Sequence, residues 1–236
     1  MNILITGASS GIGAALAKRY LEEGNTVFGI SRHRNRSLDR KARFHFLAQD
    51  LSDFKGLRKR FPAFLFPPLD LNLVILNAGV LGEIKDMRKT SVSRINAVMK
   101  VNVWANKVLL DLLFRNLNSV DQVVAISSGA SVSGARGWNA YALSKAALNM
   151  LIRLYSKEET ETHFCALAPG IIDTKMQEYI SAISETDKYP VVEKLQKARG
   201  TEKMPGPEEA ADKLISAMRL AKEYESGSFL DVRDLL

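Results

Sequence analysis

A glycine-rich turn set between a strand and a helix constrains the fold of this chain more than any other feature. Residues 2–5 form the apolar run of a short buried strand, residues 6–13 contain three glycines, and a helical pattern covers residues 14–23. Glycines here allow close approach of the backbone to a diphosphate, and the helix N-terminus supplies amide donors. The pattern also fits an ordinary turn with a helix cap, and its spacing differs from G-x-G-x-x-G. Its place directly after the first strand favours the nucleotide interpretation.

The rest of the chain repeats this alternation of strand and helix. Further strands are predicted at residues 26–30, 44–48, 71–76, 122–126, 162–167 and 228–232, and helices at residues 52–61, 91–116, 141–156 and 208–223. Parallel strands buried on both faces are apolar almost throughout, as residues 71–76 are. With 236 residues and 46% hydrophobic content, the chain is expected to form one doubly wound α/β domain, with a parallel seven-stranded sheet and helices on both faces.

Two connecting segments have distinctive compositions. Residues 61–68 contain three prolines among aromatic residues, which predicts an irregular connection packed on the body of the protein. Residues 175–207 are polar and charged, with few apolar anchors and with glycine or proline at the joints. We expect them to form one or two lid helices that close over a bound ligand.

The second predicted strand ends in Ser31 and Arg32, where NAD-selective folds usually place an acidic residue that binds the ribose 2′-hydroxyl. A hydroxyl and a guanidinium at this point predict a preference for NADP(H), with NAD(H) as the alternative cofactor. Three neighbouring arginines, Arg34, Arg36 and Arg40, fit a solvated basic loop.

Other polar residues follow later strands. Asp50 can hydrogen-bond an adenine or cap the next helix. The small residues at 77–79 let the backbone approach a ligand, although such turns are common for purely structural reasons. Ser128 is expected to be a hydrogen-bond donor, because none of the three histidines accompanies it in a plausible catalytic triad. Asn102 lies inside a predicted helix, where an asparagine is ordinarily a bystander.

Tyr141 and Lys145 stand one turn apart on a predicted helix and therefore share a face. At roughly 5 Å and an effective dielectric near 20, the ammonium would lower the pKa of the phenol by roughly 2 units. A tyrosine tuned in this way can transfer a proton near neutral pH. The pair alone is weak evidence, since such spacing also arises by chance.

Composition limits the other classes of function. The formal net charge is +7, which could indicate nucleic acid binding, but an anionic small molecule near residue 32 explains part of the basic excess equally well. The single cysteine, Cys165, lies in an apolar run and is expected to be a buried, inert thiol. No apolar run of about 18 residues and no basic leader is present, so we expect a cytoplasmic protein without a membrane partner.

Together these residues resemble the classical short-chain dehydrogenase/reductase family over essentially the whole chain. The motifs that carry the resemblance are the T-G-x-x-x-G-x-G turn at residues 6–13, the aspartate Asp50, the N-A-G sequence at residues 77–79, the tetrad Asn102, Ser128, Tyr141 and Lys145, and the segment with Pro169, Gly170 and Thr174. Residues 225–231 and the short tail look more like the C-factor/sniffer-type carbonyl reductases.

The resemblance implies a Rossmann-like fold and hydride transfer between nicotinamide and a carbonyl or alcohol substrate, without a metal. Tyr141 would protonate the substrate oxygen, Ser128 would orient it, Lys145 would lower the tyrosine pKa and bind the ribose, and Asn102 would hold a water. The cofactor-binding residues that we expect are Thr6, Gly7, Ser9, Ser10, Gly11, Ile12, Gly13, Ser31, Arg32, Asp50, Leu51, Asn77, Ala78, Gly79, Tyr141, Lys145, Pro169, Gly170, Ile172 and Thr174.

The sequence therefore predicts an NADP(H)-dependent oxidoreductase that acts as a carbonyl reductase on a small molecule. A dinucleotide-binding regulatory protein with little turnover is the alternative, and it would not need the Tyr141/Lys145 pair. A nucleic-acid partner is not expected, because the complete tetrad favours the enzyme. The family commonly assembles through the helices that correspond to residues 91–116 and 141–156, which implies a homodimer or homotetramer.

Overall fold

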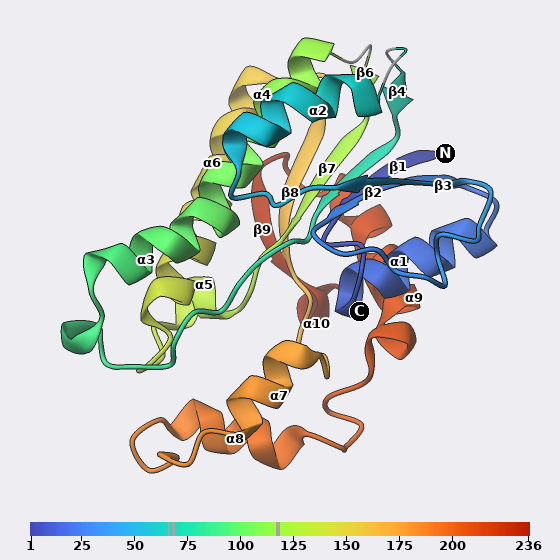
Figure 1. The fold of residues 1–236 in the computed structure, drawn as a ribbon. Coiled ribbons are helices and arrows are strands. Elements are labelled where there is room, and N and C mark those ends of the chain that lie inside the picture. Colours follow the sequence, from blue (N-terminus) through green and yellow to red (C-terminus); the bar gives the residue numbers. More distant parts are fainter. Residues whose placement is uncertain (66, 68, 117–118) are drawn as a thin grey trace.

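The computed structural model describes residues 1–65, 67, 69–116 and 119–236, and its centre is a seven-stranded sheet (Figure 1). The strands of this sheet are β1 (Asn2–Thr6), β2 (Thr26–Ser31), β3 (Phe44–Ala48), β5 (Leu73–Leu76), β7 (Gln122–Ile126), β8 (His163–Ala168) and β9 (Ser228–Asp231). Their order is β3-β2-β1-β5-β7-β8-β9, and all neighbours pair in parallel. The predicted doubly wound α/β domain is confirmed. The strand order reverses between β1 and β5, where such folds bind ligands at the carboxyl ends of the strands.

Helices cover both faces of the sheet (Figure 1). They are α1 (Gly11–Glu22), α2 (Phe54–Phe64), α3 (Val92–Met99), α4 (Ala105–Asn116), α5 (Ala130–Ser133), α6 (Asn139–Glu158), α7 (Lys175–Ser181), α8 (Pro190–Ala198), α9 (Pro207–Leu220) and α10 (Val232–Leu235). One core lies under α1 and α9, and the other lies under α2, α4 and α6. Successive residues of β1 serve the two cores in turn, because side chains alternate along a strand: Ile3 and Ile5 belong to the first and Leu4 to the second. In the part of the chain described, no helix is long and apolar enough to span a membrane.

Two predicted elements are interrupted. The strand expected at residues 71–76 divides at Asn72, whose side chain accepts a hydrogen bond from the Asn2 N–H at 2.9 Å and donates one to Asp121 at 2.9 Å. The piece before it, β4 (Asp70–Leu71), pairs separately with β6 (Ser119–Val120). The helix expected at residues 91–116 contains a π-helical turn at Lys100–Trp104, between α3 and α4.

Two boundaries differ from prediction for reasons that the structure shows. The segment 61–68 is not irregular from its start, since α2 continues through Pro62 to Phe64, with Phe61 fully buried as its anchor. Phe66 and Pro68 lie outside the described residues. Val232 begins α10 and does not end the last strand, because the Asp231 carboxylate caps the N–H of Arg233.

The cysteine prediction is confirmed. Cys165 is fully buried in β8, and this burial raises the pKa of its thiol to about 12.

Residues 175–207, where one or two helices were predicted, contain two, α7 and α8, which form a lobe beyond the carboxyl edge of the sheet (Figure 1). The expectation of few apolar anchors is wrong. Ile180, Tyr189 and Val192 are almost completely buried, and they pack with Leu81 and Trp138 of the main body in a third apolar cluster. The lobe therefore has a small core of its own, shared with the body.

The two ends of this lobe are fastened together at its base. The Arg199 side chain donates a hydrogen bond to the Asp173 carboxylate at 3.1 Å, and the Asp173 N–H donates one to the Pro205 carbonyl at 2.9 Å. The chain thus leaves and rejoins the body at neighbouring points.

Candidate active site

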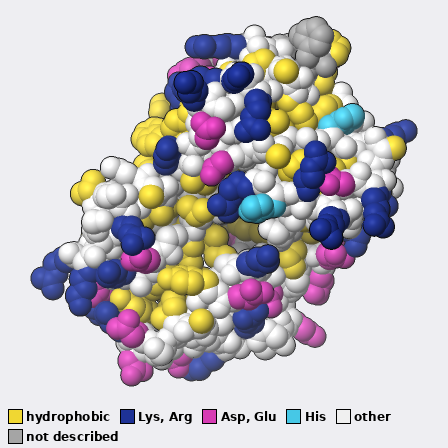
Figure 2. Space-filling model, in the orientation of Figure 1, with side chains coloured by type: hydrophobic (Ala, Val, Ile, Leu, Met, Phe, Trp, Pro, Cys, Tyr) yellow, Lys and Arg dark blue, Asp and Glu magenta, His cyan; other side chains and the backbone are white. Residues whose placement is uncertain are grey.

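A cleft of about 1170 Å³ lies at the carboxyl ends of the strands, between the sheet and the α7–α8 lobe. Figure 2 shows hydrophobic side chains gathered around this hollow, with basic side chains near its edges. Almost all the predicted site residues line the cleft. Three do not: Thr6, Gly13 and Asn102 are set back from its surface.

The glycine turn leaves room for a ligand only because it lacks side chains. Gly7 and Gly11 have φ angles of 72° and 55°, which favour glycine. A Cβ on Gly13 would stand 2.4 Å from the Gly7 carbonyl oxygen, and one on Gly7 would stand 2.8 Å from the Asn77 Nδ2. On the side of the turn that faces the protein interior, the backbone therefore packs directly against its neighbours, with no room for a side chain. On the side that faces the cleft, the lining residues are Gly7, Ser9, Ser10 and Gly11. This bare surface beside the first turn of α1 fits a dinucleotide diphosphate.

Thr6 and Asn77 hold this turn against the end of β5. The Thr6 hydroxyl accepts hydrogen bonds from the N–H groups of Asn77 and Ala78 at 2.9 and 3.0 Å. The Asn77 amide donates to the Thr6 carbonyl at 2.9 Å. Thr6 is fully buried, so it shapes the site and does not line it.

The adenine end of the cleft carries the residues expected to select the cofactor. Arg32 is exposed and lines the cleft. Ser31 is buried, and its hydroxyl donates to the His33 carbonyl at 3.0 Å, so its proton is already engaged. Arg34, expected to lie in a solvated loop, also lines the cleft, with its guanidinium 5.2 Å from the centre of the Phe46 ring.

Asp50 does not cap the following helix, because Asp53 does so by accepting from the Gly56 N–H at 2.9 Å. Asp50 instead accepts from the Ser52 N–H at 2.8 Å, a bond that holds the pKa of its carboxyl below the ordinary value; the nearby Arg32 acts in the same direction. The capping alternative is therefore wrong for Asp50, which lines the cleft beside Leu51.

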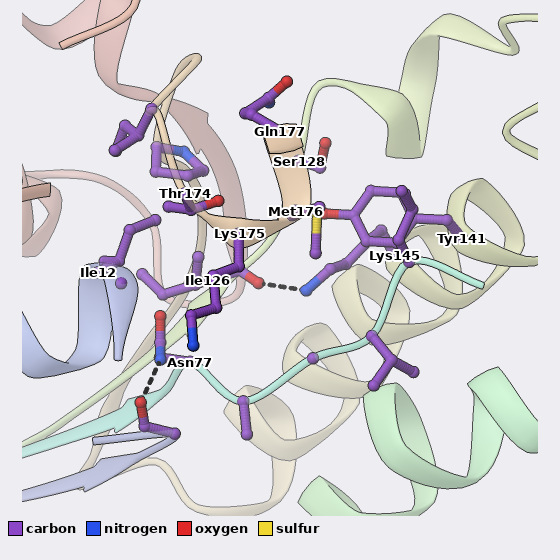
Figure 3. Close-up of a pocket in the computed structure, with 18 of the residues that line it drawn as sticks. Ile12, Asn77, Ile126, Ser128, Tyr141, Lys145, Thr174, Lys175, Met176 and Gln177 are labelled. Atoms are coloured by element: carbon purple, nitrogen blue, oxygen red, sulfur yellow. Dashed lines mark hydrogen bonds between the residues drawn. The ribbon is translucent and has the colours of Figure 1, made fainter. Parts of the chain in front are cut away.

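Ser128, Tyr141 and Lys145 meet at the centre of the cleft (Figure 3). Ser128 follows β7, while Tyr141 and Lys145 lie on α6, as the one-turn spacing predicts. Lys145 is buried, and its ammonium donates to the Ile126 carbonyl at 2.6 Å. Burial lowers the pKa of Lys145 from 10.5 to about 8.

The expected lowering of the Tyr141 pKa is not found. The ammonium of Lys145 lies 5.6 Å from the centre of the tyrosine ring and is directed at Ile126. Burial of the phenol raises the Tyr141 pKa, and the hydroxyl of Ser128 opposes this only in part. The spacing of the two residues does not reveal desolvation, which acts against the charged form of both side chains.

Asn102 supports the site from below. It lies in the π-helical turn and is fully buried. Its side chain accepts from the Val80 N–H at 2.8 Å and donates to the Val80 carbonyl and the Ser144 hydroxyl, each at 2.9 Å. The amide is thus occupied in holding the segment after Gly79, which explains its place behind the cleft wall.

Sequence reasoning missed the wall on the lobe side of the cleft. Its apolar members are Leu81, Trp138, Met176, Ile180, Val191 and Leu195. It also missed Asp231 and Arg233, which line the cleft from the carboxyl end of the last strand. Leu81 and Trp138 lie two and three residues from predicted motifs, which was the available signal.

Comparison with known proteins agrees with this geometry. The family model of the short chain dehydrogenases matches residues 1–184. The chain belongs to the short-chain dehydrogenase/reductase family. It is therefore an oxidoreductase that acts on carbonyl or alcohol groups of small molecules with NAD(H) or NADP(H).

One relative within this family is a benzil reductase ((S)-benzoin forming) from Bacillus subtilis, which is 30% identical over 99% of this chain and 98% of that protein. The short chain dehydrogenase/reductase YIR035C from Saccharomyces cerevisiae has the same fold, with a TM-score of 0.85 and 24% identity over 98% of this chain and 95% of that one. A putative NAD(P)-dependent gluconate 5-dehydrogenase from Beutenbergia cavernae, solved with bound NADP, has a TM-score of 0.81 and 24% identity, covering 98% and 94% of the two chains.

Proposed function

We propose that this short-chain dehydrogenase/reductase is an NADP(H)-dependent carbonyl reductase for substrates with an apolar body. The observation that carries the proposal is the meeting of Ser128, Tyr141 and Lys145 directly beside the apolar lobe-side wall of the cleft. A bulky hydrophobic group can lie on that wall while its carbonyl faces the two hydroxyls. The benzil reductase relative, whose name specifies an aromatic diketone substrate, supports this choice.

The residues divide the work as follows. When bound, the nicotinamide supplies the hydride that adds to the carbonyl carbon. Ser128 donates a hydrogen bond that orients and polarises the carbonyl oxygen, and Tyr141 gives that oxygen its proton. The raised pKa of Tyr141 keeps the phenol protonated at neutral pH, which suits an acid in the direction of reduction. Lys145 replaces the proton and holds the ribose, and Asn102 acts as a positioning residue for Val80.

The test is consumption of NADPH by the purified protein with a panel of aromatic and aliphatic ketones, aldehydes and diketones. We expect turnover of bulky aromatic carbonyls, and Tyr141→Phe should lower kcat by about 10² to 10⁴ because proton transfer is lost. The Kd for NADPH should stay nearly unchanged, since the phosphate contacts and the ribose contact of Lys145 are kept. Full activity of Tyr141→Phe would overturn the assignment of the acid.

The preference for NADP(H) rests on Arg32, because Ser31 has its proton engaged elsewhere. A well-made charge-assisted bond contributes roughly 1.5 to 3 kcal/mol, so a single arginine contact gives a preference of roughly tenfold to a hundredfold. Arg32→Ala should equalise the Kd values for NADPH and NADH. Arg36→Ala is the matched control, because Arg36 is exposed in the same loop but does not line the cleft. Equal affinities in the wild type would exclude the preference.

The proposal also covers the oligomeric state of the protein and its location in the cell. Trp104 on the π-helical turn and Leu143, Met150 and Leu154 on α6 are about half exposed. These apolar residues support assembly into a homodimer or homotetramer through the predicted helices. The molar mass of the protein in solution, measured by light scattering, tests this. A cytoplasmic location remains a prediction.

A further inference from the structure

An ion pair at the end of the last strand forms part of the cleft wall. Asp231 ends β9, and Arg233 lies in the first turn of α10. The Arg233 Nε donates to Asp231 Oδ1 at 2.8 Å, and Nη2 donates to Oδ2 at 2.5 Å. Asp231 is only 8% exposed, whereas the Arg233 side chain is 66% exposed. A buried carboxylate therefore fixes the direction of a guanidinium that is still open to the cleft.

The guanidinium lies beside the proposed reaction centre. Its Nη2 is 3.6 Å from the point where a Cβ on Gly129 would stand, and Gly129 directly follows Ser128. A guanidinium has five N–H donors, and Asp231 takes two of them. The remaining donors are available to a ligand that is held by Ser128.

The basic side chains around this part of the cleft take no part in the proposed reduction step. The carboxylates that line the described cleft are Asp50, at the adenine end, and Asp231, which Arg233 neutralises. Lys194 of α8 lines the lobe side and has no carboxylate within ion-pair distance among the described residues. Lys175 points from α7 toward Asn77, at the cofactor end (Figure 3). A neutral carbonyl substrate would leave both Arg233 and Lys194 without a role.

We infer that the substrate is an oxo acid, with its apolar body on the lobe-side wall and its carboxylate bound by Arg233. The inference rests on the proposed function and names its substrate class. A planar guanidinium matches a carboxylate by two parallel hydrogen bonds. Since Arg233 is largely exposed and already has one ion partner, the expected gain is about tenfold and not several thousandfold. Lys194 adds a weaker, unpaired positive charge across the cleft.

The experiment compares aryl oxo acids, with the carboxylate one to three carbons from the carbonyl, with their methyl esters. For at least one acid, wild-type kcat/KM with NADPH should exceed that of its ester by about tenfold. Arg233→Gln should remove this preference by lowering the acid value alone, and Arg233→Lys should keep part of it. Arg219→Gln is the control, because Arg219 is also 66% exposed but pairs with Glu23 far from the cleft. The Kd for NADPH should be the same in all four proteins.

Three outcomes would overturn the inference: no acid preferred over its ester by the wild type, equal losses for acid and ester in Arg233→Gln, or weaker NADPH binding in that variant. The last would make Arg233 a cofactor contact. Calorimetric titration of the acids into the NADP⁺-bound protein separates this inference from the proposed function. Binding that depends on Arg233 without any turnover would refute the reductase proposal and retain the acid site. Turnover of the esters but not of the acids would retain the reductase proposal and refute the acid site.

Discussion

The two ends of the cleft are built by different means. At the cofactor end, glycines and short side chains hold backbone segments at contact distance, as between Gly13 and Gly7. At the substrate end, large side chains such as Trp138 and Tyr189 pack a lobe against the body. At Gly13 the first construction leaves no room for an added Cβ, whereas the second can change shape when one side chain changes. The cofactor is common to the family, which suits the first construction. The substrate is particular to one member, which suits the second.

Tyr189→Ala should have the largest effect, and it should be confined to the substrate end. Removing a buried aromatic ring costs about 3–5 kcal/mol, so amides of residues 175–198 should exchange with solvent at least a hundredfold faster. Amides of β1, β5 and β7 should keep their protection. Hydrogen exchange followed by mass spectrometry measures both regions at once.

Tyr179→Ala is the matched control for this prediction, since Tyr179 lies in the same lobe but is 46% exposed. If Tyr189→Ala reduced the protection of the sheet as much as that of the lobe, the two ends would unfold as one unit. The two ends would then differ in how they are built but not in their stability against local unfolding.

Gly13→Ala should break the cofactor end. The added Cβ would lie 2.4 Å from the Gly7 oxygen and 2.5 Å from the Asn77 Nδ2, so the turn must shift. We expect the Kd for NADPH to rise by about tenfold to a hundredfold, in line with an overpacking cost of about 1–3 kcal/mol. Gly206→Ala, which meets no atom within 4 Å, should leave the Kd unchanged. An unchanged Kd in Gly13→Ala would show that this end also adapts.

Lys145→Met should have the smallest effect on the fold, and a favourable one, although it removes turnover. Because burial disfavours the charged ammonium, we expect the melting temperature without cofactor at pH 7 to rise by about 2–4 °C for each kcal/mol gained.

The pH dependence of this gain has a definite sign. The Lys145 pKa is about 8 in the folded protein and 10.5 ordinarily, so between these values the unfolded chain binds more protons. Wild-type stability therefore rises with pH across this window, and the advantage of Lys145→Met should shrink there. Melting curves at pH 7, 9 and 10.5 measure it. A constant difference would mean that the folded and unfolded chains bind the same number of protons, so that burial does not lower the Lys145 pKa.

The same contrast explains how far the sequence could predict the site. The cofactor end is local in sequence, because residues 6–13 and 77–79 each follow a strand directly and meet at one edge of the sheet. The substrate end joins Leu81, Trp138, Met176 and Arg233, which are far apart in the chain and have ordinary side chains. For three of them the only sequence signal is position: Leu81 follows Gly79, Trp138 precedes Tyr141, and Arg233 follows the last strand.

Packing and burial were the other limits on prediction. The polar composition of residues 175–207 concealed three buried anchors, since a few apolar side chains suffice when the partner surface is provided by the body. The spacing of Tyr141 and Lys145 was predicted correctly, but the surrounding dielectric decides the sign of the pKa shift. That dielectric is set by the atoms that bury both side chains, which come from distant parts of the chain.

The fastening at the base of the lobe bears on how such enzymes diversify. Since Asp173, Arg199 and Pro205 bring the two ends of the segment together, the lobe behaves as an insert with a fixed pair of attachment points. Its length and composition can vary between homologues without a change in the spacing of the strands that carry it. A segment from a related enzyme could be grafted at these points as a cassette, bringing its own specificity to an unaltered catalytic body.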